Sequence, residues 1–197
     1  MERYTEIRWH GRAQQGVVTA AKLLGEAALR EGKYVQAFPD FGPERMGAPV
    51  RAFNRLSTEP IRLHCGVKNP DVVIIVDPTL IAGGGVSQSP LLDGMKEDTV
   101  FIVNTPKGAA GMRGALGLKN GEGKVYTVDA SRISLEKIGR HLPNTAMLGA
   151  LAKVTNVVEM SALIENFKEN YSKKFSPKVV EGNIGAMEKG SQDVKGE

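Results

Sequence analysis

Three short runs of apolar, mostly β-branched residues constrain the fold of this chain more than any other feature. They occupy residues 72–76 (VVIIV), 100–103 (VFIV) and 125–128 (VYTV). A continuous apolar run of this length is typical of a strand buried on both faces, as in a parallel sheet. Parallel strands need long crossover connections, which are usually helical. The runs therefore predict an open α/β sheet with helices packed on both of its faces.

The first thirty residues predict a strand, a tight loop and a helix. Apolar residues alternate up to about residue 9, and apolar residues at helical spacing follow over about residues 15–30. The loop between them reads Gly11-x-Ala13-x-x-Gly16. Such a unit points the free N–H groups of a helix N-terminus at an anion, so the loop is a candidate phosphate site.

This loop departs from the dinucleotide-binding fingerprint, which has three glycines. Gly11 and Gly16 can make the tight turn and the close contact between helix and strand, but Ala13 carries a Cβ where the middle glycine belongs. Asp40 follows at about the spacing of a ribose-binding acid, within a Pro- and Gly-rich segment whose composition favours a structural role. A nicotinamide-binding domain is therefore not favoured, and a phosphate-bearing ligand of another kind stays open.

Further strands are predicted from alternation and turn residues. Residues 34–38 read as the second strand, and residues 48–56 alternate between two faces. After the turn at Pro60, residues 61–64 read as the return strand of a hairpin. Cys65, directly after them, is expected to be half-buried.

The last third of the chain predicts helices. Asn144 is expected to cap one helix, Ser161 to begin a second, and Ser176 to cap a third that has proline at its first helical position. The expected fold is thus a Rossmann-like, doubly wound, mostly parallel open α/β sheet with a β-hairpin addition and C-terminal helices. It forms one domain over residues 1–188, followed by a polar tail over residues 189–197 that is expected to fray.

Polar residues follow each of the three buried strands. They are Asp77, Asn104 and Asp129. Ligands bind such sheets at the carboxyl ends of strands, but residues of these types more often cap the following turn, and a capping role is favoured for each. Residues 108–123 contain six glycines, and Lys107, Arg113, Lys119 and Lys124 lie within or directly beside them. They either close over an anionic ligand or form a surface excursion, and the second interpretation is favoured.

Composition excludes several classes of protein. The single cysteine excludes an intramolecular disulfide and argues against an iron–sulfur cluster held by this chain alone. His10, His64 and His141 lack metal-ligand spacing. The net charge of +4 comes from basic residues scattered among acids, which disfavours nucleic-acid binding. No apolar run approaches the ~20 residues that span a bilayer, and no signal peptide is present, so a cytoplasmic protein is expected.

Four separated blocks of sequence match one known family. They are EIRWHGR at residues 6–12 with Gln15 and Gly16; GKYVQAFP at 32–39 with GPER at 42–45 and GAP at 47–49; NPDVV at 69–73 with DPTL at 77–80; and NTAMLGAL at 144–151. In these blocks the chain resembles the gamma subunit of 2-oxoacid:ferredoxin oxidoreductases, most closely that of the pyruvate and related 2-oxoacid enzymes. The family usually has two glycines, or Ala-Gly, where this chain has Ala13 and Gln14.

The resemblance implies a role in a larger complex. In such complexes the thiamine-binding alpha and beta subunits hold thiamine diphosphate and Mg²⁺, and a ferredoxin-like delta subunit holds [4Fe–4S] clusters. The gamma subunit is a Rossmann-like domain beside the thiamine site and is associated with coenzyme A. The implied reaction is oxidative decarboxylation of a 2-oxoacid to acyl-CoA, CO₂ and reduced acceptor, with no catalytic residue in this chain.

Two groups of site residues are expected. The phosphates of coenzyme A are assigned to the loop and the start of the helix: Gly11, Arg12, Ala13, Gln14, Gln15, Gly16 and Val17. Contacts with partner subunits or substrate are assigned to Phe41, Glu44, Arg45 and Met46, with an intrachain ion pair as the alternative for the charged pair. Two other hypotheses stay open: a stand-alone nucleotide-binding regulatory module, and a structural subunit whose loop has lost its ligand.

Overall fold

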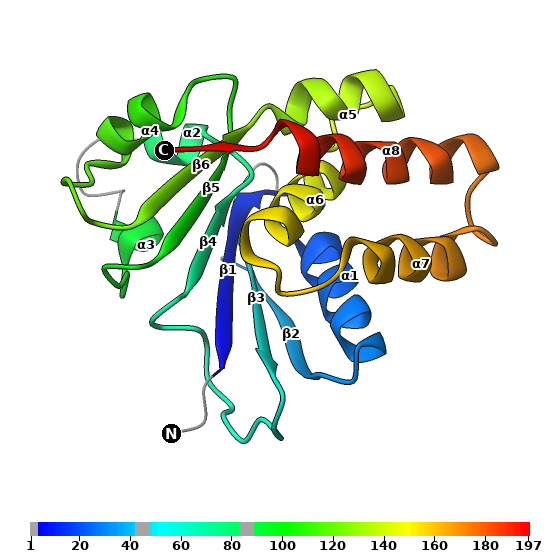
Figure 1. The fold of residues 1–197 in the computed structure, drawn as a ribbon, viewed down its shortest axis with the longest axis horizontal. Coiled ribbons are helices and arrows are strands. Elements are labelled where there is room, and N and C mark those ends of the chain that lie inside the picture. Colours follow the sequence, from blue (N-terminus) through cyan, green and yellow to red (C-terminus); the bar gives the residue numbers. More distant parts are fainter. Residues whose placement is uncertain (1–3, 42–47, 83–88) are drawn as a thin grey trace.

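In the computed structural model, which describes residues 4–41, 48–82 and 89–197, a seven-stranded sheet carries helices on both faces (Figure 1). The strands are β1 (Thr5–Arg12), β2 (Tyr34–Phe41), β3 (Pro49–Ser57), β4 (Val72–Ile75), β5 (Val100–Asn104), β6 (Lys124–Val128) and β7 (Lys195–Gly196). The helices are α1 (Val17–Arg30), α2 (Thr79–Ala82), α3 (Ser89–Leu92), α4 (Ala109–Leu116), α5 (Ala130–Ile138), α6 (Asn144–Thr155), α7 (Met160–Tyr171) and α8 (Pro177–Asp193). The predicted α/β class is confirmed.

The sheet is mixed, and its strand order is β2-β3-β1-β4-β5-β6-β7. The four central strands, β1, β4, β5 and β6, are parallel neighbours. The three apolar runs form β4, β5 and β6, as predicted. The carboxyl ends of parallel strands share one edge of a sheet, so the loop after β1 lies beside the turn after β4.

The hairpin is built from other strands than predicted. β3 pairs antiparallel with β2 on one side and with β1 on the other, so it separates the first two strands of the chain. Residues 61–64 form no strand, and Cys65 is exposed rather than half-buried. The physical reason is that both edges of β3 are occupied along its whole length, which leaves no edge for a return strand.

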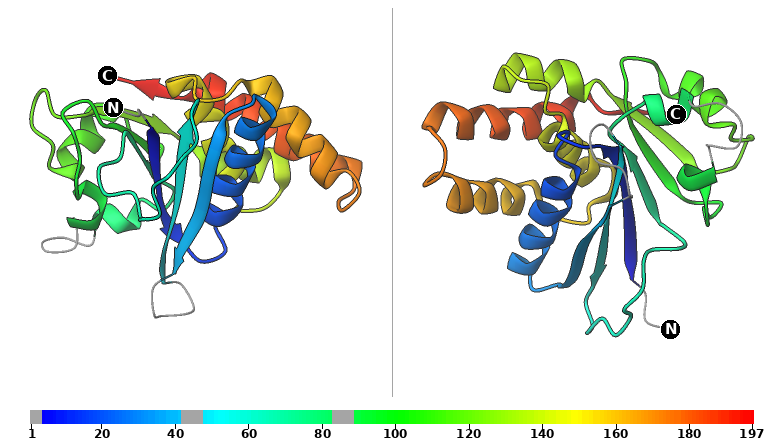
Figure 2. Two further views of the ribbon diagram at one scale, coloured as in Figure 1. Left: turned by 90° about the horizontal axis from the view of Figure 1, so that it is seen from below. Right: turned by 180° about the vertical axis from the view of Figure 1, so that it is seen from behind.

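Helices cover the two faces of the sheet unequally (Figures 1 and 2). Helices α1 and α5–α8 enclose the larger apolar cluster, in which Ile7, Trp9 and Met147 are fully buried. Helices α2–α4 cover the other face of β4–β6 around Val73 and Phe101. The face of β1 that carries Ile7 and Trp9 is therefore fixed against α1.

A buried hydrogen-bond chain joins β1, β3 and α1 behind the predicted loop. The indole Nε1 of Trp9 donates to Oδ1 of Asn54 at 2.8 Å, and Nδ2 of Asn54 donates to the carbonyl of Ala21 at 2.8 Å. All the polar atoms in this chain of contacts are satisfied, so it holds the first helix in one position on the sheet.

Helices α6 and α8 approach so closely that glycine is required at the crossing. A Cβ added to Gly149 would overlap the main-chain carbonyl of Met187, and one added to Gly190 would overlap that of Ala146. Residues 144–152 of α6 are all buried. This helix is therefore a central element of the core.

The expectation that the tail frays from Lys189 was wrong. Helix α8 continues to Asp193, and β7 then pairs with β6 at the edge of the sheet. The side-chain carboxylate of Glu197 accepts a hydrogen bond from Nε of Arg113 at 2.7 Å. The polar composition of the tail is explained by these edge contacts, because polar residues suit an edge strand that faces water on one side.

The glycine-rich segment at residues 108–123 is not a loop directed at a ligand. It contains α4, and the guanidinium of Arg113 donates to the main-chain carbonyls of Lys119, Glu122 and Gly123. These bonds fold the segment back on itself beside β6. Arg113 is thus used within the chain and is not available to an anionic ligand.

Candidate functional site

The predicted loop is a compact turn between β1 and α1. Gly16 is the N-cap of α1 and has a left-handed backbone conformation with φ of 76°. Gln14 is also left-handed, with φ of 72°, a conformation that costs most residues about 1–2 kcal/mol. These two left-handed residues, separated by Gln15, direct the main chain of the loop sharply into the helix.

The side chain of Gln15 ties this loop to the end of β4. Its Oε1 accepts a hydrogen bond from the main-chain N–H of Arg12 at 2.8 Å, and its Nε2 donates to Oδ2 of Asp77 at 2.7 Å. Both ends of the amide are therefore used inside the chain. In this arrangement Gln15 shapes the loop, and its assignment as a direct ligand contact stays a prediction.

Asp77 connects three elements at the carboxyl edge of the sheet. Its Oδ1 accepts from the N–H and hydroxyl of Thr79, which is the predicted capping role, and Nε of Arg12 lies 3.3 Å from its Oδ2. Burial by itself raises the pKa of Asp77, but the hydrogen bonds from Thr79 and Gln15 and the charge of Arg12 outweigh it and hold the pKa below its ordinary value. Asp77 is thus a charged anchor for the loop.

The loop's remaining donors belong to its main chain. The first N–H groups of a helix have no acceptor within the helix, and α1 has neither a side-chain cap nor an acidic residue in its first turn. The partial positive charge of the helix dipole at the N-terminus of α1 is therefore not neutralised by any side chain of the first turn. Gly11 is buried in β1, Gln14 is exposed, and Val17 is buried at the start of α1.

Asn144 is a member of this region that sequence reasoning did not assign to the site. It was predicted as a helix cap, but the N-cap of α6 is Pro143, and Asn144 is the first helical residue. A Cβ added to Gly16 would lie 2.5 Å from Nδ2 of Asn144, so the carboxamide rests directly on the N-cap of α1. The sequence signal that could have assigned Asn144 to the site is its position in the block at residues 144–151, one of the four that match the family.

The other expected site residues lie away from this loop or outside the residues that the structure describes. Phe41 ends β2 and pairs with Val50, whereas residues 42–47, which include Glu44, Arg45 and Met46, lie outside the described residues. Asp40 is 2.6 Å from Arg51 in an ion pair on β2, which β3 separates from β1. It is therefore not a ribose-binding acid next to the loop. Asp129 has the predicted capping role, because it accepts a hydrogen bond from the N–H of Arg132. The capping role predicted for Asn104 was wrong, because its Oδ1 accepts from the N–H of Ser131, 27 positions away, and its Nδ2 donates to the carbonyl of Val76.

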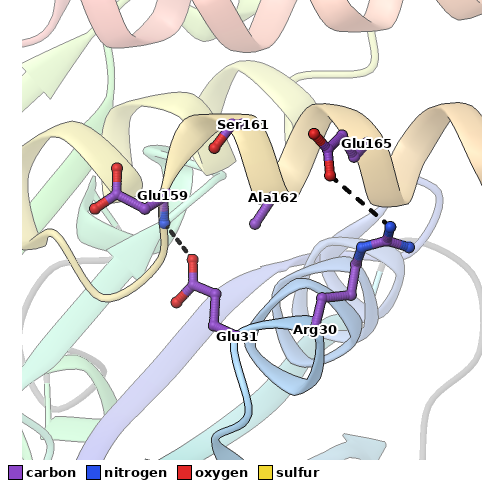
Figure 3. A pocket seen from close by; sticks show the side chains of 6 residues that line it. All are labelled: Arg30, Glu31, Glu159, Ser161, Ala162 and Glu165. Atoms are coloured by element: carbon purple, nitrogen blue, oxygen red, sulfur yellow. Dashed lines mark hydrogen bonds and ion pairs between the residues drawn. The ribbon is translucent and has the colours of Figure 1, made fainter.

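A cavity of about 410 Å³ at the far end of α1 is a poorer candidate. Figure 3 shows the residues that line it between α1 and α7, with Arg30 and Glu165 at one end and Glu31 and Glu159 at the other. Arg30 is paired with Glu165 and Glu169, and Glu31 accepts a hydrogen bond from the N–H of Glu159 at 2.6 Å. These contacts hold the two helices together, and their charge is unsuited to an anionic ligand.

His10 is a buried neutral imidazole next to the loop, and it predicts an acid-sensitive fold. Burial first, and then the charges of Arg8 and Arg51, lower the pKa of His10 to about 3, from 6.5 for an ordinary histidine. Between these values the unfolded state binds more protons, so stability is complete above pH 6.5 and is lost as the pH falls toward 3. The expected slope is up to about 1.4 kcal/mol per pH unit.

This expectation is tested by urea unfolding at pH 7.5, 6.5 and 5.5. The variant His10→Gln is expected to lose part of the wild-type dependence on pH over this range. The control is His64→Gln, because His64 is exposed. Equal slopes for the wild type and His10→Gln would contradict the assignment.

Comparison with known proteins identifies the family. The family described as pyruvate ferredoxin/flavodoxin oxidoreductase matches residues 6–192, nearly the whole chain. The chain belongs to this family. The resemblance to the gamma subunits, stated above from four sequence blocks, is confirmed by relatives that match nearly the whole chain.

Three relatives illustrate the likeness. The Pyrococcus abyssi pyruvate/ketoisovalerate oxidoreductases common subunit gamma is 45% identical over 184 residues, which are 93% of this chain and 96% of that protein. The crystal structure of the Thermotoga maritima pyruvate oxidoreductase subunit PORC has a TM-score of 0.86 and 41% identity, and the match covers 100% of this chain and 99% of that one.

The third relative is a larger protein of the same fold. The 2-oxoglutarate:ferredoxin oxidoreductase of Magnetococcus marinus, solved with 2-oxoglutarate, coenzyme A and succinyl-CoA bound, has a TM-score of 0.74 and 22% identity. The match covers 98% of this chain and 31% of that one. The family fold therefore also occurs as one part of a longer polypeptide.

The described residues contain neither a membrane-spanning helix nor a cluster of metal-ligand side chains. No helix in residues 4–41, 48–82 and 89–197 is long and apolar enough to cross a bilayer. Within the same ranges, no three His, Cys, Asp or Glu side chains come together in a way that would hold a metal ion.

Proposed function

We propose that this chain is the gamma subunit of a thiamine diphosphate-dependent 2-oxoacid:ferredoxin oxidoreductase complex and holds coenzyme A at the start of α1. The complex converts pyruvate or a related 2-oxoacid to acyl-CoA, CO₂ and reduced acceptor. Its partners are thiamine-binding alpha and beta subunits, with thiamine diphosphate and Mg²⁺, and a ferredoxin-like delta subunit with [4Fe–4S] clusters. The family membership supports this role, and so does the coenzyme A bound in the related Magnetococcus marinus complex.

The observation that carries the proposal is the uncapped N-terminus of α1 at the carboxyl edge of the parallel strands. Coenzyme A bears several phosphate groups, and the free N–H groups and dipole of a helix N-terminus suit such a ligand. The loop that presents them is already fixed by Gln15 and Asp77. The residues present therefore fit a phosphate group.

In this proposal the chain binds and orients but does not react. Thiamine diphosphate on the partner subunits supplies the carbanion chemistry that decarboxylates the oxoacid, and the clusters carry electrons away. The main-chain N–H groups of residues 17–19 donate hydrogen bonds to the phosphate oxygens. Arg12, whose side chain is 35% exposed beside Asp77, adds positive charge at the mouth of the loop.

The test places a negative charge in the first turn of α1. Thr19 is exposed there, at the position where a glutamate normally stabilises a helix. The variant Thr19→Glu is therefore expected to keep its stability while the dissociation constant for coenzyme A rises about tenfold. The measurement is calorimetric titration of the intact complex with coenzyme A, and the uncharged control of the same size is Thr19→Gln.

The control variant is expected to bind like the wild type. If Thr19→Glu and Thr19→Gln both match the wild type, coenzyme A does not lie on this helix, and the structural-subunit hypothesis gains support. Oxidation of a 2-oxoacid by the isolated chain would contradict its assignment as a non-catalytic subunit.

A further inference from the structure

Two helix N-termini, far apart in the sequence, lack the residues that normally neutralise them. The N-cap of α1 is Gly16 and that of α6 is Pro143, and neither provides a side-chain cap. Neither helix has an acidic residue in its first turn. Each N-terminus carries the equivalent of about half a positive charge, so two uncompensated charges remain at this point of the fold.

The two N-termini meet at a single contact. The Asn144 carboxamide lies against Gly16, with Nδ2 within 2.5 Å and Cγ within 2.7 Å of where a Cβ on Gly16 would be. Helices α1 and α6 pack against one another on the same face of the sheet (Figure 1). The first turn of α6 is therefore directed at the same place as the first turn of α1.

The carboxamide of Asn144 is buried, and one of its atoms is unsatisfied. The residue is 3% exposed, and its Oδ1 has no hydrogen-bond partner among the residues that the structure describes. An unpaired buried polar atom costs about 1–3 kcal/mol. Native structures rarely keep such an atom unless another molecule completes it, so this junction has the properties of an incomplete binding site.

We propose that Asn144 and the N-terminus of α6 form the second half of the coenzyme A site, and that one phosphate group of the nucleotide end is bound between the two helices. The identity of the ligand rests on the function proposed above. The phosphate oxygens accept hydrogen bonds from the main-chain N–H groups of both helices and from Nδ2 of Asn144. The adjoining ribose hydroxyl donates to Oδ1, so a nucleotide satisfies both ends of the carboxamide.

The experiment introduces a charge at Asn144 in the intact complex. Asn144→Asp replaces the amide by a carboxylate of nearly the same shape, which repels a phosphate at this point. The dissociation constants for coenzyme A and for adenosine 3′,5′-bisphosphate are each expected to rise about tenfold or more by calorimetric titration. The matched control is Asn156→Asp, because this exposed residue lies at the opposite end of α6, roughly 18 Å away.

A second pair of variants tests the same contact if Asn144→Asp fails to assemble. Gly16→Ala forces a methyl group against Asn144, whereas Gly32→Ala introduces the same backbone strain where no atom of the described residues lies within 4 Å of the new methyl group. Their φ angles are 76° and 77°, so the backbone cost is matched. Gly16→Ala is expected to weaken binding of both ligands about tenfold, and Gly32→Ala is expected to leave it unchanged.

Two results would overturn the inference. The first is an assembled Asn144→Asp complex that binds both ligands like the wild type. The second is loss of assembly in Asn144→Asp while Gly16→Ala keeps full affinity, which would point to a carboxylate of a partner subunit at this junction. If Thr19→Glu weakens binding and Asn144→Asp does not, only this inference fails; if neither weakens it, the proposed function fails as well.

Discussion

Replacement of Gly190 by alanine is expected to lower the free energy of unfolding by about 3 kcal/mol or more. The new Cβ would overlap the main-chain carbonyl of Ala146 across the contact between α6 and α8. Main-chain atoms cannot turn aside as a side chain can, and this part of α6 is wholly buried. The two helices must therefore separate, which exposes apolar surface on both. Urea unfolding followed by circular dichroism measures the loss.

The same helix provides a control for the helical preference of alanine. At Gly185 the nearest atom to an added Cβ is Cδ of Lys137 at 3.6 Å, which is an ordinary contact. Gly185→Ala is therefore expected to stabilise the protein by up to about 1 kcal/mol, the gain of alanine over glycine in a helix. Equal unfolding curves for the two variants would show that the α6–α8 contact is looser than the structure indicates.

Substitution of Arg55 by methionine is expected to destabilise the fold by about 3–5 kcal/mol. Arg55 is 1% exposed, and its guanidinium bonds Oε1 of Glu6 at 2.6 and 2.8 Å and Oε1 of Gln36 at 2.7 Å. It also donates to the carbonyl of Cys65 at 3.3 Å. Methionine fills much of the volume but leaves the carboxylate of Glu6 without its counter-charge. The measurement is again the free energy of unfolding in urea.

The control lies four residues earlier on the same strand. Arg51 forms an ion pair with Asp40 at 2.6 Å, but both side chains are about two-fifths exposed. Exposed pairs of this kind contribute at most about 1 kcal/mol, so Arg51→Met is expected to have a small effect. If both methionine variants lose the same stability, burial of Arg55 does not determine its contribution.

Local patterns of the sequence were sufficient to predict most of the individual elements. The three apolar runs became β4–β6 because a strand buried on both faces leaves a continuous apolar run that few other structures produce. The last helix begins at Pro177 with Ser176 at its N-cap position, as predicted, although the Ser176 side chain makes no capping hydrogen bond. Asp129 caps α5. Each of these features depends on residues within a few positions of one another.

The order of the strands was less predictable. The alternation of residues 48–56 correctly indicated a strand, but it does not say which neighbours the strand takes. Two edges were available, those of β1 and β2, and β3 fills both. The pairing depends on contacts between residues tens of positions apart, for which the sequence pattern carries no direct signal.

In the candidate site too, some features were predictable from the sequence and others were not. Gly16 was visible because a left-handed turn favours glycine, and Gly16 is left-handed. Gly11 is instead a residue of β1, where an added Cβ would lie 2.4 Å from the side chain of Val17. The internal role of Gln15 was not visible, since its partner Asp77 lies 62 positions away. Asn144 was assigned to a cap because its type favours that role, whereas the fold places it against the other helix.

The sequence by itself determined the α/β class, the buried central strands and a turn that opens a helix N-terminus, because hydrophobic period and turn chemistry are local properties. Only the tertiary structure decided that β3 enters between β1 and β2, that the last residues close the sheet, and that Asn144 meets Gly16. Those contacts join segments that are far apart in the chain. They form because packing of the whole core lowers the free energy, and no local sequence pattern encodes that packing.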